Sequence, residues 1–119
     1  MDFDEAIQAH SDWKLRIYAA ALNGNQEGLD PDGIAKETLC HLGKWLFGEG
    51  RSFFSSRNEY DDLVRLHADF HHHAALLVIM INRGQGREAL AALENRNSGY
   101  SQASLKVTQK LIELKSRTR

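Results

Sequence analysis

The sequence predicts an all-α fold, namely an antiparallel four-helix-type bundle with a short additional helix. Apolar residues recur at spacings of three and four over several long segments, which is the period of an amphipathic helix. The chain contains a single proline, Pro31, and its β-branched residues are scattered rather than gathered into the runs typical of strands. Hydrophobic residues make up 42% of the 119 residues, which suits a single domain over residues 1–119 with a modest core.

The first predicted helix spans about residues 2–22. The apolar spacing places six residues on the face expected to meet the core: Phe3, Ile7, His10, Lys14, Ile17 and Ala21. From this face, Lys14 is expected to extend its long side chain to solvent or to a carboxylate. Asn23-Gly24-Asn25 follows and predicts the end of the helix, because glycine and asparagine tolerate the left-handed cap conformation.

A second helix is predicted to begin at Pro31. Asp30 can cap the free N–H groups of the first turn, and proline suits the first helical position because no donor is needed there. The expected inward residues are Ile34, Leu39, Cys40, Leu42 and Leu46. Gly48 and Gly50 are expected to break this helix, so that it covers residues 31–47.

The third predicted helix is the longest, and Ser55, Ser56 or Asn58 is expected to cap it. Its apolar face is expected to comprise Tyr60, Leu63, His67, Phe70, His71, Ala74, Leu77, Val78 and Ile81. His72 and His73 are rotated away from this face and are expected to meet solvent or a neighbouring element. The glycines of Arg83-Gly84-Gln85-Gly86 end the pattern.

Two further helices complete the predicted bundle. A short helix is expected over residues 87–94, followed by a turn or kink over residues 95–99. The last helix is predicted over about residues 101–115, with a frayed tail over residues 116–119. Its expected apolar residues are Leu105, Val107, Leu111, Ile112 and Leu114.

Composition and charge argue against several classes of protein. Fifteen Lys and Arg residues against sixteen Asp and Glu residues give a net charge of −1, without the basic patch usual in nucleic-acid-binding proteins. The longest apolar run, residues 74–81, is far shorter than the ~18 residues of a membrane span. The acidic N-terminus lacks the features of a signal peptide, and one cysteine cannot form an internal disulfide. We therefore expect a cytoplasmic domain that contacts neither nucleic acid nor membrane.

Four residues of the type that binds metals fall on three of the predicted helices. His67 and His71 are four residues apart, so they lie one turn apart on one helix face. Two buried histidines need partners, and either a shared metal ion or hydrogen bonds to backbone and carboxylate groups would serve. Cys40 alone is also explained as a small buried apolar residue, and His10 alone as a structural one. Together, three imidazoles and one thiolate make a tetrahedral set that suits Zn²⁺.

The residues around these positions form three short motifs. They are His10-Ser11-Asp12-Trp13-Lys14, Cys40-His41-Leu42-Gly43-Lys44-Trp45 and His67-Ala68-Asp69-Phe70-His71-His72-His73-Ala74. In this order and at these separations they resemble the chemoreceptor zinc-binding (CZB) domain family, whose motifs are H-x-x-W-K, C-x-x-G-K-W and H-x-x-F-H-x-x-A. The resemblance covers nearly the whole chain, and the motifs are specific only in combination.

The resemblance implies one zinc ion held by His10, Cys40, His67 and His71 in a cytoplasmic helical bundle. Members of this family regulate signalling proteins, most often bacterial chemoreceptors and diguanylate cyclases, and act as homodimers. They respond to zinc itself or to oxidants that attack the zinc-bound cysteine. The 119 residues contain neither a coiled-coil receptor nor a cyclase domain, so the chain is either a stand-alone member or a piece of a longer protein.

We therefore expect a regulatory zinc sensor, and no enzymatic activity, because four protein ligands leave no open position for water or substrate. Three other functions fit parts of the pattern. They are a zinc domain that only stabilises a dimer or interaction surface, a haemerythrin-like di-iron bundle, and a metal-free interaction bundle. A di-iron site would need inward carboxylates, and the apolar face of the third predicted helix carries none.

Residues beside the four ligand positions are expected to support the site. Asp12 and Asp69 are near enough in sequence to hydrogen-bond ligand rings, although a solvated surface position is the favoured interpretation of both. Trp13 and Trp45 are large enough to seal the site from solvent, or to pack in the core. Loss of the bond between Cys40 and zinc is expected to let the short second helix move or melt.

Overall fold

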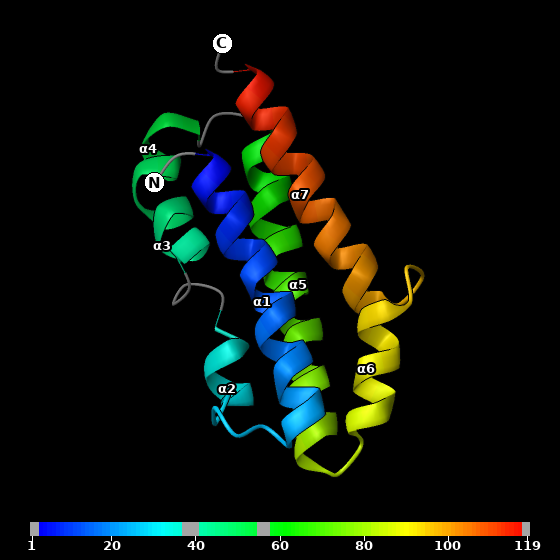
Figure 1. Cartoon of the computed structure of the whole chain (residues 1–119). Coiled ribbons are helices and arrows are strands. Elements are labelled where there is room, and N and C mark those ends of the chain that lie inside the picture. The colour runs from blue at the N-terminus through cyan, green and yellow to red at the C-terminus, as the bar shows by residue number, and fades with distance from the viewer. Residues whose placement is uncertain (1–2, 37–40, 55–57, 118–119) are drawn as a thin grey trace.

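The computed structural model of the chain describes residues 3–36, 41–54 and 58–117. Within these residues the chain forms helices and no strand, which confirms the all-α prediction (Figure 1). The helices are α1 (Phe3–Asn23), α2 (Pro31–Ile34), α3 (His41–Phe47), α4 (Glu49–Phe54), α5 (Asn58–Asn82), α6 (Gly86–Glu94) and α7 (Gly99–Arg117). Among them, none is long and apolar enough to cross a membrane.

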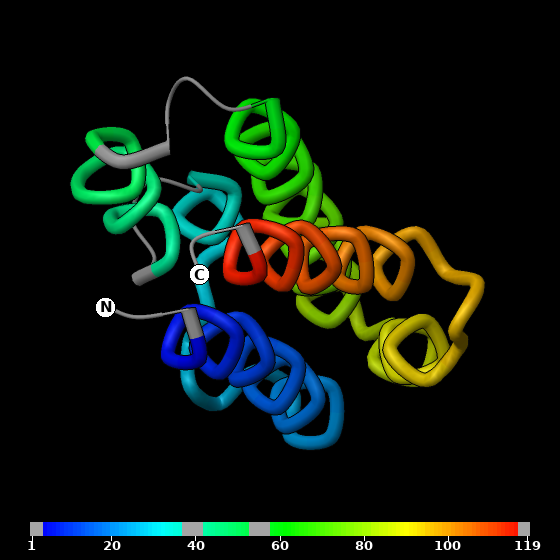
Figure 2. The backbone as a smooth tube through the Cα atoms, turned by 90° about the horizontal axis from the view of Figure 1, so that it is seen from above, coloured from blue at the N-terminus to red at the C-terminus, as the bar shows by residue number. Residues whose placement is uncertain are grey.

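The helices occupy the four positions of an antiparallel bundle (Figures 1 and 2). α1 and α5 run in the same direction, whereas α2–α4 and α6–α7 form the two segments that run the opposite way. α2–α4 pack on one side of the α1–α5 pair, with α2 against α5 and α3 against α1. α7 packs against both α1 and α5 on the other side. Side chains between α1 and α5 therefore meet α2 on one side and α7 on the other.

α1 begins and ends within one residue of its predicted span. Gly24 and Asn25 follow it with φ angles of 74° and 64°, which is the left-handed conformation that the Asn-Gly-Asn sequence predicted. The buried face differs from the predicted one, because it comprises Ala6, His10, Ile17 and Ala20. Lys14 is exposed, so its predicted place on the inward face was wrong. The buried line passes through the half-buried Trp13 instead, 100° away around the helix.

The second predicted helix is interrupted. α2 begins as expected, with Pro31 in the first position and the Asp30 carboxylate accepting a hydrogen bond from the Asp32 N–H at 3.2 Å. It ends after one turn at Ile34, and the Lys36 N–H turns back to the Gly33 carbonyl. The continuous helix over residues 31–47 was therefore wrong. Leu39 and Cys40, which it was expected to carry, lie outside the described residues.

Gly48 separates α3 from α4, as a helix break was predicted there, but the chain becomes helical again at once. A Cβ atom on Gly50 would lie 3.1 Å from the Trp45 ring and 3.0 Å from the Trp45 carbonyl oxygen. The missing side chain thus lets α4 fold closely against the last turn of α3. Sequence patterning did not predict α4, because Gly50 was expected, together with Gly48, to keep the chain out of a helix.

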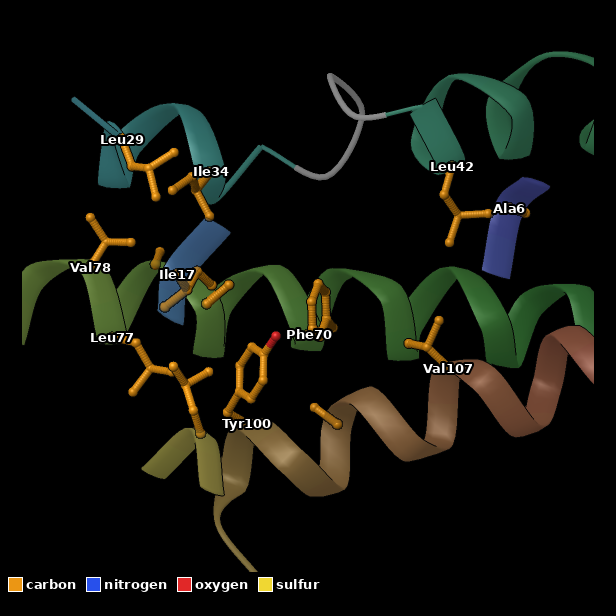
Figure 3. Packing of buried hydrophobic residues seen from close by; sticks show 14 of the residues in the cluster. Ala6, Ile17, Leu29, Ile34, Leu42, Phe70, Leu77, Val78, Tyr100 and Val107 are labelled. Carbon is orange, nitrogen blue, oxygen red and sulfur yellow. The ribbon is translucent and has the colours of Figure 1, made fainter. Parts of the chain in front are cut away.

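α5 forms the centre of the bundle and confirms its predicted face. The nine residues predicted to face inward are all buried, and Ala75 joins them. Figure 3 shows Phe70, Leu77 and Val78 of this helix lying between side chains of the elements around them. Ile17 approaches from α1, Ile34 from α2, and Tyr100 and Val107 from α7. α5 begins at Asn58, and the alternative caps Ser55 and Ser56 lie outside the described residues.

The last two helices follow the predicted order, with α6 over nearly its expected span. α7 is longer than predicted and remains helical to Arg117, so the predicted fraying was wrong for residues 116 and 117, and residues 118–119 lie outside the described residues. Val107, Leu111 and Leu114 are buried, whereas Leu105 and Ile112 are 49% and 53% exposed and do not belong to the core. Two helical positions correspond to a rotation of about 200°, which places Leu105 on the face opposite Val107.

Candidate metal centre

Two histidines of α5 meet inside the bundle. His67 and His71 are each 1% exposed, and their Nε2 atoms lie 3.0 Å apart. The spacing of four along a regular helix puts both rings on the inward face, as the sequence predicted. The rings stand edge to face, with centroids 4.5 Å apart. Two ring nitrogens are therefore directed at one point in the core.

The backbone of α2 fixes the protonation of His71. Nδ1 of its ring lies 2.6 Å from the carbonyl oxygen of Ile34, and this oxygen can only accept a hydrogen bond. Nδ1 therefore carries a proton, and Nε2 is the ring nitrogen that lies toward His67. The edge of Trp13 packs against the same ring at a centroid distance of 5.8 Å. His71 is thus oriented by three elements of the bundle, α1, α2 and α5.

His10 enters the same region from α1. It is 3% exposed, and its ring lies 4.1 Å from the Phe70 ring, centroid to centroid. Its Nε2 atom is 3.1 Å from the Ser104 hydroxyl of α7. His10, His67 and His71 line one cavity of ≈ 680 Å³, so the predicted histidines do come together around one space.

The three histidines do not converge completely. Among the described residues, no three His, Cys, Asp or Glu side chains are arranged to hold one metal ion. His67 and His71 meet, and His10 shares their cavity with its Nε2 directed at Ser104. The fourth predicted ligand, Cys40, lies outside the described residues, but Lys36 and Leu42 on either side of it in sequence both line the cavity.

Burial favours the neutral form of the His10 and His67 rings at physiological pH. Removal from water lowers the pKa of His10 to about 4, with a further contribution from the nearby His71. The same cause, followed by the proximity of His71 and His10, lowers the pKa of His67 to about 3. Neutral imidazole is the form that binds a metal, and the proton between the Nε2 atoms of His67 and His71 would have to move away before both nitrogens ligate one ion.

The rim of the cavity is polar. The Arg16 side chain donates to the Glu27 carboxylate, with Nε 3.0 Å from Oε2, and its guanidinium lies over the Trp13 ring at 4.4 Å. Trp13 therefore lies between His71 and the exposed Arg16–Glu27 ion pair, which supports the prediction that it covers this side of the cavity. Trp45 is buried in the core without lining the cavity, so the packing interpretation applies to it.

Asp12 and Asp69 both lie on the surface, which confirms the favoured interpretation of these two carboxylates. Asp12 is exposed and accepts from Gln8, and the exposed Asp69 lies 3.8 Å from His73. The groups that contact ligand rings are instead the Ile34 carbonyl and the Ser104 hydroxyl. Sequence reasoning missed both. A backbone carbonyl has no signature in a sequence, and Ser104 is 94 residues away from the histidine that it contacts.

The donor set fits a zinc ion. Two nitrogens bound to one tetrahedral zinc at about 2.0–2.1 Å lie about 3.3 Å apart, close to the 3.0 Å between the Nε2 atoms of His67 and His71. A zinc-binding histidine usually donates its other N–H to a carbonyl or carboxylate, as His71 does to Ile34. No carboxylate is among the buried residues of α5, which disfavours a di-iron centre.

Comparison with known proteins identifies one match. The family model of the chemoreceptor zinc-binding domain matches residues 10–78. The matched stretch begins at His10, includes Cys40, His67 and His71, and ends within α5. α6 and α7 lie beyond it. Neither the curated proteins nor the solved structures contain a match to the chain.

Proposed function

This chain belongs to the chemoreceptor zinc-binding domain family, and from that premise we propose that it is a regulatory zinc sensor with His10, Cys40, His67 and His71 as ligands. The domain is a zinc-binding one related to signalling. The observation that carries the proposed ligand set is the buried His67–His71 pair, whose Nε2 atoms lie 3.0 Å apart. His10 on the same cavity, and Cys40 in the segment between two lining residues, supply the remaining donors.

The chemistry of these donors favours zinc over other metals. Thiolate and imidazole are the ligands of closed zinc sites, whereas magnesium and calcium prefer oxygen. When bound, zinc keeps the Cys40 sulfur as a thiolate at neutral pH, which is the form that oxidants attack. Four protein ligands leave no position for a substrate, and for this reason the proposal is a non-enzymatic domain.

The sensory part of the proposal concerns the segment that holds Cys40. α2 has only four residues and α3 has seven, so neither helix is stable without its contacts to the rest of the bundle. Gain or loss of zinc, or oxidation of Cys40, would change the anchoring of this segment while His67 and His71 remain on a long helix. We propose that this change is the signal passed to a partner.

The partners belong to the same proposal. We propose that the domain is cytoplasmic, forms a homodimer, and regulates a chemoreceptor or a diguanylate cyclase as a fused domain or a separate protein. Family membership supports a signalling partner in general terms. Light scattering on the purified chain tests the dimer directly. A monomer at micromolar concentration, with and without zinc, would contradict it.

Metal content per chain is the decisive test of the proposed site. Elemental analysis of protein purified without a histidine tag is expected to give about one zinc per chain, with a lower content in Cys40→Ala and His67→Ala. The matched control is His72→Ala, which removes an exposed histidine from the same helix. Zinc content that is indifferent to Cys40 would overturn the ligand set.

A second measurement separates a sensor from a structural site. Zinc exchange with a chelator, and release of zinc on treatment with a mild oxidant, are expected to occur in minutes at neutral pH. A purely structural zinc would resist both, because its removal would require unfolding of the domain. Retention of zinc under both treatments would leave a zinc-stabilised interaction domain as the function.

A further inference from the structure

We propose that Ser104 of α7 is a positioning residue of the zinc site, because it holds Nε2 of His10 and turns Nδ1 of that ring toward the metal. This inference rests on the proposed role of His10 as a ligand. Ser104 lies outside the part of the chain that matches the family model, since that match ends at residue 78. Nothing in the three ligand motifs points to it.

The contact joins a buried histidine to a half-buried serine. Nε2 of His10 is 3.1 Å from Oγ of Ser104, and the histidine is 3% exposed. The Phe70 ring lies against the imidazole with a centroid distance of 4.1 Å. The ring is therefore held by a hydrogen bond from α7 and by an aromatic contact from α5, so it has little freedom to rotate.

The two ligand rings that touch other segments are held in the same manner. His71 has one ring nitrogen on the Ile34 carbonyl and the other beside His67. His10 has one ring nitrogen on Ser104, and its ring lines the cavity that His67 and His71 share. A ring nitrogen in a hydrogen bond to the protein leaves only the opposite nitrogen for a metal. The geometry thus assigns Nε2 of His71 and Nδ1 of His10 as the ligating atoms.

The protonation state of His10 depends on this hydroxyl. A neutral imidazole has one N–H and one lone pair, and the ring binds a metal only through the lone pair. When Nε2–H donates to Oγ of Ser104, the lone pair is on Nδ1 of a ring that lines the cavity. Without Ser104, the buried Nε2–H has no such acceptor, and the tautomer with the proton on Nδ1 becomes competitive.

Neighbouring residues keep Ser104 in place. Its own carbonyl accepts a hydrogen bond from the Thr108 hydroxyl at 3.2 Å. One turn before it, Tyr100 packs against Phe70 at a centroid distance of 5.3 Å. This face of α7 is consequently fixed against the same aromatic ring that contacts His10, and the hydroxyl is presented from a rigid helix.

The first test measures zinc affinity by competition with a chromogenic chelator. Ser104→Ala is expected to weaken zinc binding about 10–100-fold, the usual cost of losing a group that orients a ligand. Ser104→Thr, which keeps the hydroxyl, is expected to restore most of the affinity. Ser101→Ala removes a hydroxyl one turn earlier in the same helix and serves as the control.

The second test identifies the ligating nitrogen without any substitution. Nitrogen-15 NMR of the wild-type chain loaded with cadmium-113 is expected to show coupling of the metal to Nδ1 of His10 and a proton on its Nε2. Coupling to Nε2 would overturn the assignment even if Ser104→Ala failed to fold.

The variant His10→Ala distinguishes the ligand role of His10 from the positioning role of Ser104. Unchanged zinc affinity in His10→Ala would show that His10 is not a ligand, and the proposed ligand set would fail. A large loss of affinity in His10→Ala with none in Ser104→Ala would reject only the positioning role. Loss in both, with rescue by Ser104→Thr, is the outcome that the structure predicts.

Discussion

α5 and the α2–α4 segment lie side by side around the same site, yet they are built differently. α5 is one helix of 25 residues with ten buried side chains. The other segment is divided into helices of four, seven and six residues. α5 satisfies its backbone internally and contributes two of the proposed ligands, His67 and His71, from one face. α2 ends on a hydrogen bond from one of those histidines, so its structure depends on the site.

This difference divides the metal centre into a stable half and a dependent half. A long helix with a continuous buried face retains its structure when one contact is lost. A helix of one turn has a costly nucleus and few internal hydrogen bonds, so it follows the contacts around it. Substitutions and metal removal should therefore affect the two halves unequally.

The largest effect is expected for His71→Ala, which breaks the link between the halves. It removes a proposed ligand, leaves the Ile34 carbonyl without the ring N–H and creates a cavity in the core. We expect the free energy of unfolding without metal to fall by ~2–4 kcal/mol, and zinc binding to weaken more than 100-fold. Urea denaturation and chelator competition measure the two quantities. His72→Ala should change stability by less than ~0.5 kcal/mol.

Acidification of the metal-free chain is expected to produce the next largest effect. The folded chain protonates His10 and His67 only near pH 4 and pH 3, whereas the unfolded chain does so near 6.5. As the pH falls below 6.5 the unfolded state binds more protons, so folding stability decreases until the folded pKa values are reached. Between pH 7 and pH 5, each of these two histidines should lower the free energy of unfolding by ~1–2 kcal/mol. His67→Asn should show a shallower dependence in urea denaturation, and an identical slope would contradict this assignment.

Hydrogen exchange tests the unequal halves directly. Removal of zinc is expected to accelerate exchange of residues 31–47 by ~10-fold or more, with little change in the central turns of α5. The reason is that the first segment contains Cys40 and only short helices, whereas α5 has its own buried face. Peptides from α7 provide an internal reference. Equal protection of residues 31–47 with and without zinc would eliminate this mechanism.

The smallest effects concern two glycines within the short helices. Gly50→Ala would bring a methyl group to 3.1 Å from the Trp45 ring, and we expect a loss of ~1–2 kcal/mol in the free energy of unfolding. Gly33→Ala meets its nearest atom at 3.5 Å, an ordinary contact, and replaces glycine in a helix. This second variant should stabilise the chain by ~0.5–1 kcal/mol in thermal or urea unfolding. If Gly50→Ala stabilised the chain and Gly33→Ala destabilised it, the close packing at Gly50 and the free space at Gly33 would both be contradicted.

The predictable parts of this fold are those that local sequence determines. The inward face of α5, the end of α1 at Gly24 and the start of α2 at Pro31 each depend on residues a few positions apart. Lys14 and Leu105 were misplaced because several helical faces fit a short apolar pattern, and only packing selects one. Val107 and Leu111 are buried, and this fixes the orientation of α7 and exposes Leu105.

The candidate site also has parts that local sequence predicts and parts that it does not. The pair of histidines on α5 follows from a spacing of four, and the motifs around His10 and Cys40 suggest the full ligand set. The partners of the rings could not be predicted, because the Ile34 carbonyl is a backbone group and Ser104 belongs to a distant helix. The hydrogen bond accepted by the last residue of α2 was missed for the same reason, since its donor is a side chain 37 residues later.

The hydrogen bond between His10 and Ser104 also bears on the order in which the domain is completed during synthesis. The two residues are separated by 94 positions, so this contact closes one of the longest loops in the chain. A nascent chain that has emerged as far as α5 already contains every proposed ligand, yet it lacks the residue that orients the first of them. If Ser104 positions His10 as proposed, the full affinity for zinc would be reached only when the last helix has docked, and the ion would be captured by a finished bundle rather than by a folding one.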